Sequence, residues 1–245
     1  MSKKWILITG GSRGIGRSLV TELLSSWNVI FTGRTETGLS DTLAEAAKID
    51  SPFWARGYAC DGKNEVQVEE LSLSLLEEFG PPTAIIHNAG IARDALHIHQ
   101  NADVWLDVIN TNLVAIINWN RHLVPPMLLE GYGSIVLMSS ITGLKGNIGQ
   151  TAYAASKSAM FGVARSLAHE VGRFGIRVNC VAPGLIESDM TEAIPVEKLK
   201  AMKKNIPLRR LGRPEEVAKV VEFLIGENSQ YITGQTIILD GGATA

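Results

Sequence analysis

Cysteine is almost absent from this sequence, which has only Cys60 and Cys180 among its 245 residues. Both lie in apolar, strand-like contexts, so we expect buried thiols in a reducing compartment and no disulfide framework. Long apolar runs are absent too, because none approaches the roughly 18 residues of a membrane-spanning helix. The apolar segment Trp5–Thr9 ends at Gly10 and is too short for a signal peptide. These absences predict a cytoplasmic protein without a membrane span.

The sequence also lacks a surplus of positive charge. Its 23 Lys and Arg residues and 25 Asp and Glu residues give a formal net charge of −2. Proteins that bind nucleic acids usually carry a basic surplus, so no nucleic-acid partner is expected. The chain has no internal repeat, low-complexity segment or linker, and its 45% hydrophobic residues are typical of a globular protein. We therefore predict one domain over residues 1–245.

Short apolar runs alternate with helix-prone stretches along the chain. The strands are expected at 5–9, 29–32, 53–60, 84–87, 135–138, 176–181 and 236–239. The helices are expected at 17–26, 39–49, 65–79, 103–129, 153–167 and 214–225. This alternation predicts the α/β class, as a single-domain Rossmann-type doubly wound parallel sheet with helices on both faces. Ligands bind such sheets at the carboxyl ends of the strands.

A glycine-rich loop, TGGSRGIG at residues 9–16, joins the first expected strand to the first expected helix. Glycines allow a tight turn and a close approach of the backbone to a ligand, and the free N–H groups at a helix start attract a pyrophosphate. A glycine-rich turn without a ligand is the alternative, but the strand–loop–helix context favours a dinucleotide site. The candidate cofactor contacts in this loop are Gly10, Ser12, Arg13, Gly14, Ile15 and Gly16.

The end of the second expected strand indicates which dinucleotide binds. An acidic residue at this place would accept hydrogen bonds from a ribose 2′-hydroxyl and repel a 2′-phosphate, but the sequence has Gly33 followed by Arg34. Arg34 and Arg13 can together hold a phosphate through charge-assisted, bidentate bonds. We therefore predict NADP(H) over NAD(H). Glu36 supports the alternative, since it could contact a ribose or pair with Arg34, and Arg34 could also be a solvated loop residue.

Three side chains form a candidate for acid–base chemistry. Ser140 follows the apolar run 135–138, and Tyr153 and Lys157 are four residues apart in an alanine-rich, helix-prone stretch. This spacing places the phenol and the ammonium on one helix face. A tyrosine normally has a pKa near ~10, and a neighbouring cation is expected to lower that pKa toward the range useful for proton transfer. The alternative is a buried tyrosine, a solvated lysine and a loop serine, since this spacing also arises by chance.

Six motifs together resemble the short-chain dehydrogenase/reductase family in type and order. They are TGGSRGIG at 9–16, HNAG at 87–90, NTNL at 110–113, Ser140, YAASK at 153–157 and APG at 182–184, and they span nearly all of the chain. Three longer segments, GNIGQTAYAASK, APGLIESDMT and IPLRRLGRPEEVA, look like the bacterial 3-oxoacyl-[acyl-carrier-protein] reductases of that family.

The resemblance implies an activity. It is the NADPH-dependent reduction of a β-ketoacyl thioester on an acyl carrier protein, in fatty-acid synthesis or in polyketide or polyene synthesis. One alternative is a reductase of another ketone or a dehydrogenase of another secondary alcohol, such as an acyl-CoA, a sugar or a steroid. The other is a non-catalytic scaffold that binds NADP.

The resemblance also implies roles for individual residues. Tyr153 would protonate the substrate oxygen, Ser140 would position that oxygen, and Lys157 would contact the nicotinamide ribose. Asn112 would anchor a water that leads to the lysine. The further implied cofactor contacts are Asp61, Gly62, Asn88, Ala89, Gly90, Tyr153, Lys157, Pro183, Gly184, Ile186 and Ser188.

Two residues depart from the family pattern. His87 stands where the family usually has asparagine, and we expect a structural role for it. Gly62 stands where a branched apolar residue is commoner, so the packing beneath the adenine should differ. His97 and His99 could suggest a metal, but no cysteine or carboxylate cluster accompanies them, so no metal site is expected.

The polar stretch at residues 187–213 is expected to form a lid over the substrate. Its seven basic residues could form a landing surface for an acidic carrier protein, and a solvated amphipathic helix is the alternative. The basic residues are Lys198, Lys200, Lys203, Lys204, Arg209, Arg210 and Arg213. The resemblance also implies a homo-oligomer, a tetramer built from the helices at 103–129 and 153–173.

Overall fold

The computed structural model describes residues 4–188, 191 and 195–245. A parallel seven-stranded sheet forms its centre, with the strand order β3-β2-β1-β4-β5-β6-β7. The strands are β1 (Trp5–Thr9), β2 (Asn28–Gly33), β3 (Ala55–Ala59), β4 (Ala84–His87), β5 (Gly133–Met138), β6 (Ile176–Pro183) and β7 (Thr236–Leu239). The order reverses between β1 and β4, which creates a crevice at the carboxyl ends of these strands. The predicted Rossmann-type doubly wound sheet is confirmed.

Short polar side chains start several helices. The side-chain oxygens of Thr35, Asn64 and Asn101 each accept a hydrogen bond from the backbone N–H three residues later, which satisfies a free donor at the helix start. Pro214 occupies the first position of the last α-helix. The α-helices are α1 (Gly14–Leu23), α2 (Glu36–Ala46), α3 (Glu65–Phe79), α4 (Ala102–Ile109), α5 (Ala115–Glu130), α6 (Thr142–Lys145), α7 (Thr151–Val171), α9 (Val196–Lys204) and α10 (Pro214–Ile225). Three short 3₁₀ turns are η1 (His97–His99), η3 (Gly172–Phe174) and η4 (Glu227–Ser229).

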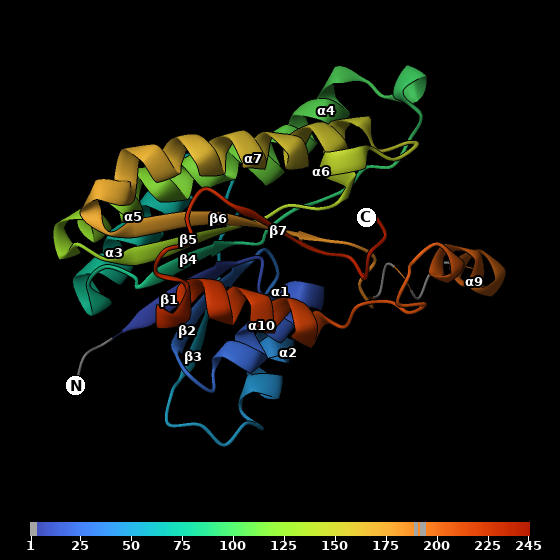
Figure 1. Cartoon of the computed structure of the whole chain (residues 1–245). Coiled ribbons are helices and arrows are strands. Elements are labelled where there is room, and N and C mark those ends of the chain that lie inside the picture. The colour runs from blue at the N-terminus through green and yellow to red at the C-terminus, as the bar shows by residue number, and fades with distance from the viewer. Residues whose placement is uncertain (1–3, 189–190, 192–194) are drawn as a thin grey trace.

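The sheet has a hydrophobic core on each face, because successive residues of a strand point to opposite sides. In β1, Trp5 and Leu7 pack with residues of α3, α5 and α7, whereas Ile6 and Ile8 pack with residues of α1 and α10. All four side chains are fully buried. Figure 1 shows α5 and α7 above the sheet and α1, α2 and α10 below it. Burial on both faces explains why the strands are continuous apolar runs in the sequence.

The single helix expected at 103–129 is divided in the structure. A π-helical segment, η2 (Asn110–Val114), separates α4 from α5, and it contains the buried Asn112. Such segments are rare and are frequently found at functional sites. The sequence pattern did not show this interruption, because its apolar periodicity continues through both helices.

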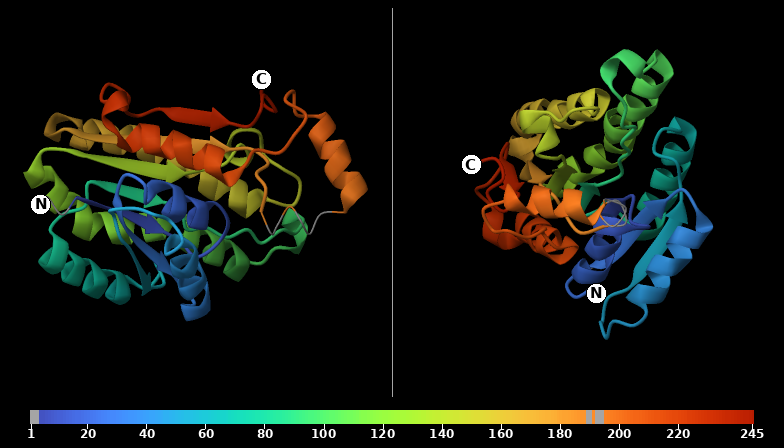
Figure 2. Two further views of the ribbon diagram at one scale, coloured as in Figure 1. Left: turned by 90° about the horizontal axis from the view of Figure 1, so that it is seen from below. Right: turned by 90° about the vertical axis from the view of Figure 1, so that its right-hand side faces the viewer.

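Two backbone hydrogen bonds join the start and the end of the segment that carries α9. The Glu187 N–H donates to the Gly212 carbonyl at 2.9 Å, and the Gly212 N–H donates to the Leu185 carbonyl at 3.0 Å. No residue of α9 is buried, and Figures 1 and 2 show this helix standing away from the sheet and its covering helices. Residues 189–190 and 192–194 of the expected lid lie outside the described residues.

Both cysteines are buried and unpaired, as predicted. Burial raises the pKa of Cys60 to about 11 and that of Cys180 to about 12, so neither thiol is reactive at neutral pH. Within the part of the chain that the structure describes, none of the helices is both long and apolar enough to cross a membrane.

Candidate active site

The glycine-rich loop after β1 lies directly against the HNAG turn after β4. The Asn88 side-chain amide donates to the carbonyl oxygens of Thr9 at 3.2 Å and Gly10 at 2.9 Å. The backbone N–H groups of Asn88 and Ala89 both donate to the Thr9 hydroxyl at 3.1 Å. Gly10 has a φ of +69°, and a Cβ added there would lie 2.7 Å from the Ala89 Cα. Only glycine therefore allows these two turns to meet.

The start of α1 has room for an anionic ligand. Gly14 is its first residue, and a Cβ added there would meet no atom within 4 Å. Gly16 lies against the loop itself, since its added Cβ would be 2.0 Å from the Gly10 carbonyl oxygen. The first turn of α1 carries no acidic side chain that would repel a phosphate. This open helix start at the crevice between β1 and β4 fits the pyrophosphate of a dinucleotide.

Two exposed arginines border this cradle. Arg13 immediately precedes α1, and Arg34 follows β2. Ser12 connects the two segments, because a Cβ added at Gly33 would lie 2.9 Å from the Ser12 Cβ. Among the described residues neither arginine is in an ion pair, and Glu36 is not paired with Arg34. Both guanidinium groups are therefore available to a phosphate.

The packing around Gly62, in the loop after β3, explains why this position lacks a branched apolar side chain. The Asp61 carboxylate accepts a hydrogen bond from the Lys63 N–H at 3.1 Å, which fixes the turn. A Cβ added at Gly62 would lie 3.1 Å from the Ala115 Cβ and 3.4 Å from the Trp119 indole nitrogen. The Trp119 side chain of α5 thus fills space that a branched side chain at 62 would need. The pairing of Gly62 with a bulky residue on α5 was not visible in the local sequence.

The segment after β6 lies at the same edge of the sheet. The Gly184 N–H donates to the Leu239 carbonyl at 2.9 Å, which joins this segment to the end of β7. Ile186 is buried, and the Ser188 N–H donates to the Thr191 hydroxyl at 2.8 Å. The implied contacts of this segment with a nicotinamide stay predictions.

Ser140, Tyr153 and Lys157 meet at the carboxyl end of β5. Tyr153 and Lys157 lie one turn apart on α7, with the Lys157 Nζ 5.6 Å from the centroid of the tyrosine ring. The same Nζ donates to the Met138 carbonyl at 2.6 Å. A Cβ added at Gly90 would lie 3.3 Å from this nitrogen, so the HNAG turn passes directly beside the ammonium group. The predicted acid–base residues and the predicted cofactor turn therefore form one site.

The pKa of Tyr153 shifts upward, whereas its spacing from Lys157 predicted a downward shift. Burial raises the pKa of its phenol, a hydrogen bond with Ser140 offsets part of this rise, and the negative charge of Asp94 raises the pKa further. The lowering expected from Lys157 is not among these effects. Burial lowers the pKa of Lys157 to about 8, below the ordinary pKa of a tyrosine, so this ammonium loses its proton before the phenol does. At pH 7 the site therefore holds a neutral phenol beside a largely charged ammonium.

Asn112 is engaged on all sides by protein atoms. Its carbonyl oxygen accepts from the Ile91 N–H at 2.8 Å, and its amide donates to the Ile91 carbonyl at 2.9 Å and to the Ser156 hydroxyl at 3.0 Å. The side chain thus joins Ile91, the residue directly after the HNAG turn, to η2 and α7. A role of Asn112 in a proton relay stays a prediction.

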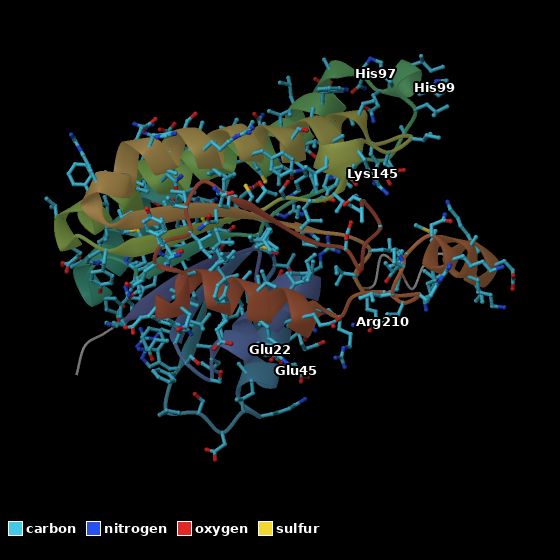
Figure 3. All side chains as sticks on the ribbon, viewed as in Figure 1. Glu22, Glu45, His97, His99, Lys145 and Arg210 are labelled. Atoms are coloured by element: carbon cyan, nitrogen blue, oxygen red, sulfur yellow. The ribbon has the colours of Figure 1, made fainter. Side chains whose placement is uncertain are left out.

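Residues after the HNAG turn lie beside the start of α7, where the His97 Nδ1 is 3.2 Å from the Thr151 hydroxyl. Figure 3 shows His97, His99 and Lys145 at the same end of the molecule as Arg210. Among the described residues no cluster of His, Cys, Asp and Glu could hold a metal ion.

Sequence reasoning missed Thr9, Asp94 and Gln150. Thr9 is in the glycine-rich motif, and Gln150 is three residues before the tyrosine of YAASK, so both could have been noticed by position. Asp94 carries no local signal, because its partners come from another part of the chain.

A nucleotide cradle at the switch point of the sheet, joined to a Ser–Tyr–Lys set, defines a dinucleotide-dependent oxidoreductase. A family model described as enoyl-(acyl carrier protein) reductase matches residues 10–244. The 3-oxoacyl-[acyl-carrier-protein] reductase FabG of Pseudomonas aeruginosa is 38% identical over 239 residues, which cover 98% of this chain and 96% of the relative. The FabG proteins of Thermotoga maritima and Chlamydia trachomatis are also 38% identical, over 98% of this chain and 97% and 96% of their own lengths. The chain belongs to the short-chain dehydrogenase/reductase family.

Proposed function

We propose that this protein reduces the ketone of a β-ketoacyl thioester, carried by an acyl carrier protein, to the 3-hydroxyacyl form with NADPH. One observation carries the proposal: the Lys157 ammonium lies beside both the Tyr153 ring and the turn that would hold a nicotinamide ribose. Full-length similarity to 3-oxoacyl-[acyl-carrier-protein] reductases supports this substrate class. Fatty-acid synthesis and polyketide or polyene synthesis are both compatible with the proposal.

The protein residues supply positioning and a proton. A bound reduced nicotinamide supplies the hydride that the carbonyl carbon accepts. The Ser140 hydroxyl can bond the carbonyl oxygen, and the Tyr153 phenol can give that oxygen its proton. Lys157 uses one N–H on the Met138 carbonyl, which leaves two donors for ribose hydroxyls. The raised pKa of Tyr153 suits this role, because a proton donor must be protonated at the working pH.

An assay with carrier-bound substrate tests the proposal. We expect oxidation of NADPH with an acetoacetyl group on an acyl carrier protein, and much slower oxidation with NADH. Free ketones, sugars and steroids should react poorly. Because the matching family model is described as enoyl reductase, a crotonyl thioester belongs in the same panel. Turnover on another ketone but not on the acetoacetyl thioester would contradict the substrate assignment, and turnover on no carbonyl would favour a scaffold.

The preference for NADPH should depend on Arg34. We expect Arg34→Ala to raise the KM for NADPH by roughly 10- to 100-fold, since hydrogen bonds to charged groups contribute about 1.5–3 kcal/mol. The KM for NADH should change little, because NADH lacks the 2′-phosphate. Steady-state kinetics with both cofactors measure this difference.

Glu36→Gln is the matched control for that prediction. It removes the carboxylate that a ribose 2′-hydroxyl could use and should leave the KM for NADPH nearly unchanged. A wild-type preference for NADH that is lost in Glu36→Gln would contradict the assignment of NADP(H).

The excursion with α9 is proposed as a lid and as the surface that the carrier protein contacts. Lys200 of α9 pairs with Glu197, whereas Lys198 and Lys204 are exposed. We expect the double variant Lys198→Glu and Lys204→Glu to raise the KM for carrier-bound substrate about tenfold at low salt, because exposed interface charges act mainly on association. The acetoacetyl group on N-acetylcysteamine should react as in wild type.

Lys219→Glu is the control, since it reverses an exposed lysine on α10 rather than on α9. If the double variant lost activity equally with the carrier-bound and the small thioester, its substitutions would damage the active site itself. The proposal that the carrier protein contacts α9 would then be wrong.

The homo-oligomer, a tetramer, stays a prediction, as does the cytoplasmic location. A groove of about 550 Å³ between α5 and α7 supports assembly through these helices. It is lined mainly by apolar side chains, including Ile117, Val124, Val163 and Leu167. Light scattering at several protein concentrations would measure the assembly state.

A further inference from the structure

Four large apolar side chains are left exposed on the loops next to Ser140 and the start of α7. The exposed fractions are 51% for Leu96, 81% for Ile98, 44% for Leu144 and 87% for Ile148. Within the described part of the chain, the hydrophobic cores of the fold include none of these four residues, which are termed the apolar rim. Single exposed apolar side chains are common, but several on neighbouring loops mark a site for a ligand or a partner.

The side chain of Gln150 ties together the three segments that carry the apolar rim. Its amide nitrogen donates to both carboxylate oxygens of Asp94, at 3.1 and 3.0 Å, in the loop that continues to Leu96. Its carbonyl oxygen accepts from the Asn147 amide at 3.0 Å and from the Thr142 hydroxyl at 3.5 Å. The loop after β4, the first residue of α6 and the turn before α7 are therefore held at one point.

Leu96 and Ile148 are brought together by their neighbours in the chain. The Ala95 N–H donates to the Gly149 carbonyl at 2.9 Å. A Cβ added at Gly149 would lie 3.7 Å from the Ala95 carbonyl carbon, which is an ordinary van der Waals contact. The two apolar residues therefore flank one pair of touching backbones, although they are far apart in the sequence.

The short helix α6, which carries Leu144, lies directly beside the reacting groups. The Thr142 N–H donates to the Ser140 hydroxyl at 3.1 Å. A Cβ added at Gly143 would lie 2.8 Å from the backbone carbonyl carbon of Lys157, so the backbone of α6 packs against α7 at the lysine itself. The apolar rim thus borders the Ser–Tyr–Lys set.

The substrate class of the proposed function has a part that fits the apolar rim. The ketone carbon of a β-ketoacyl thioester has two arms, which are the thioester and a hydrocarbon tail. The helix proposed to contact the carrier, α9, is rich in lysine, and Figure 1 shows it well apart from α6 at the same end of the molecule. A hydrocarbon tail is stabilised by leaving water for apolar side chains, and a basic, exposed helix offers it little. The rim therefore suits the tail.

We propose that the apolar rim binds the hydrocarbon tail of the substrate and gives the enzyme a preference for β-ketoacyl groups longer than four carbons. The inference rests on the proposed function, in which Ser140 and Tyr153 hold the ketone. An acetoacetyl group has only a methyl group beyond its ketone, so it gains least from the rim. Full burial of one methylene raises affinity about fourfold, and about twofold is expected on a rim where one side of the tail stays in water.

The test is a chain-length series with the full-length enzyme. Wild type is assayed with NADPH and with N-acetylcysteamine thioesters of 3-oxo acids of four, six and eight carbons, which examine the tail without the carrier. We expect kcat/KM to rise about twofold per methylene, or about 16-fold from four to eight carbons. The rise should come from a falling KM at nearly constant kcat, because the tail takes no part in the reaction and binds equally in the ground and transition states.

Substitutions in the apolar rim should flatten this series. The double variant Leu144→Ser and Ile148→Ser, and separately Leu96→Ser and Ile98→Ser, should each reduce the 16-fold ratio to about fourfold, because each removes half of the apolar side chains. The ratio between two chain lengths does not change when turnover changes equally for both. Leu129→Ser is the control, since it replaces a leucine that is 90% exposed near the amino end of β5, and it should keep the wild-type ratio.

The outcomes separate this inference from the proposed function. Turnover of the acetoacetyl thioester with equal kcat/KM at all three lengths would overturn the inference and leave the ketoreductase proposal intact. A rising series that both double variants retain would also overturn it, since the tail would then bind elsewhere. If the double variants kept the series but changed the assembly state in light scattering, the rim would serve contacts between copies of this chain, contrary to the inference. Absence of turnover with every thioester would remove the proposed function, and the inference with it.

Discussion

Replacing Tyr153 by phenylalanine should reduce turnover by roughly 10²–10⁴-fold, which is the usual contribution of a general acid. Phenylalanine keeps the aromatic ring and removes only the hydroxyl group, together with its hydrogen bond with Ser140. Binding of NADPH should remain within a few-fold of wild type, because Lys157 and the glycine-rich turns are unchanged. Single-turnover reduction of carrier-bound acetoacetate and a separate fluorescence titration of NADPH measure the two effects.

Tyr132→Phe is the matched control, since it removes a phenol hydroxyl from an exposed tyrosine before β5. It should have no effect on turnover. If Tyr153→Phe retained wild-type turnover, or if its loss came with loss of NADPH binding, Tyr153 would not be the proton donor.

Acidification should destabilise the fold through His87. This side chain is 3% exposed at the end of β4, and its Nε2 lies 2.9 Å from the Asn120 carbonyl oxygen. Burial lowers the pKa of His87 to about 4, while the bond to Asn120 acts in the opposite direction. The Asn120 oxygen can only accept, so Nε2 carries the proton of the neutral ring.

The sign of the effect follows from proton binding. Between pH 6.5 and about 4 the unfolded chain binds a proton at His87 that the folded chain does not, so the free energy of unfolding falls as the pH falls through this range. A shift of this size corresponds to a loss on the order of 3 kcal/mol, of which roughly 2 kcal/mol should appear between pH 7 and pH 5. Urea unfolding at fixed protein concentration measures it.

His87→Asn, which restores the usual family residue, should make this pH dependence shallower even if it changes the stability at pH 7. His169→Asn removes an exposed histidine of α7 and should leave the pH dependence as in wild type. Identical slopes in wild type and His87→Asn would show that His87 accepts its proton without penalty, contrary to its buried position.

Much of this molecule could be inferred from local patterns. The strands at 84–87 and 236–239 and the helix at 214–225 have the bounds that were predicted. Apolar runs, stop signals and caps act over a few residues, so they can be recognised without knowing the rest of the chain. The glycine-rich loop and the Tyr153–Lys157 spacing are local in the same sense, and the structure joins them in one site.

Other features could not be predicted, because they depend on which distant segments meet. The hydrogen bonds between Asp94 and Gln150 join two loops whose residues are 56 positions apart. The π-helical segment around Asn112 leaves the apolar periodicity of the sequence unchanged, so the sequence pattern does not reveal it. The absence of a side chain at Gly62 is explained by Trp119, which lies beside it but is distant in the sequence.

The ionisation of the Tyr153 phenol shows most clearly which properties are local and which depend on the whole fold. Residue spacing alone places a phenol and an ammonium on one helix face at the ligand-binding edge of a Rossmann-type sheet. The rise in the pKa of the phenol depends on the whole fold, because desolvation and the charge of Asp94 come from segments packed around the helix. Spacing along a helix is local geometry, whereas solvation is a property of everything that surrounds a group.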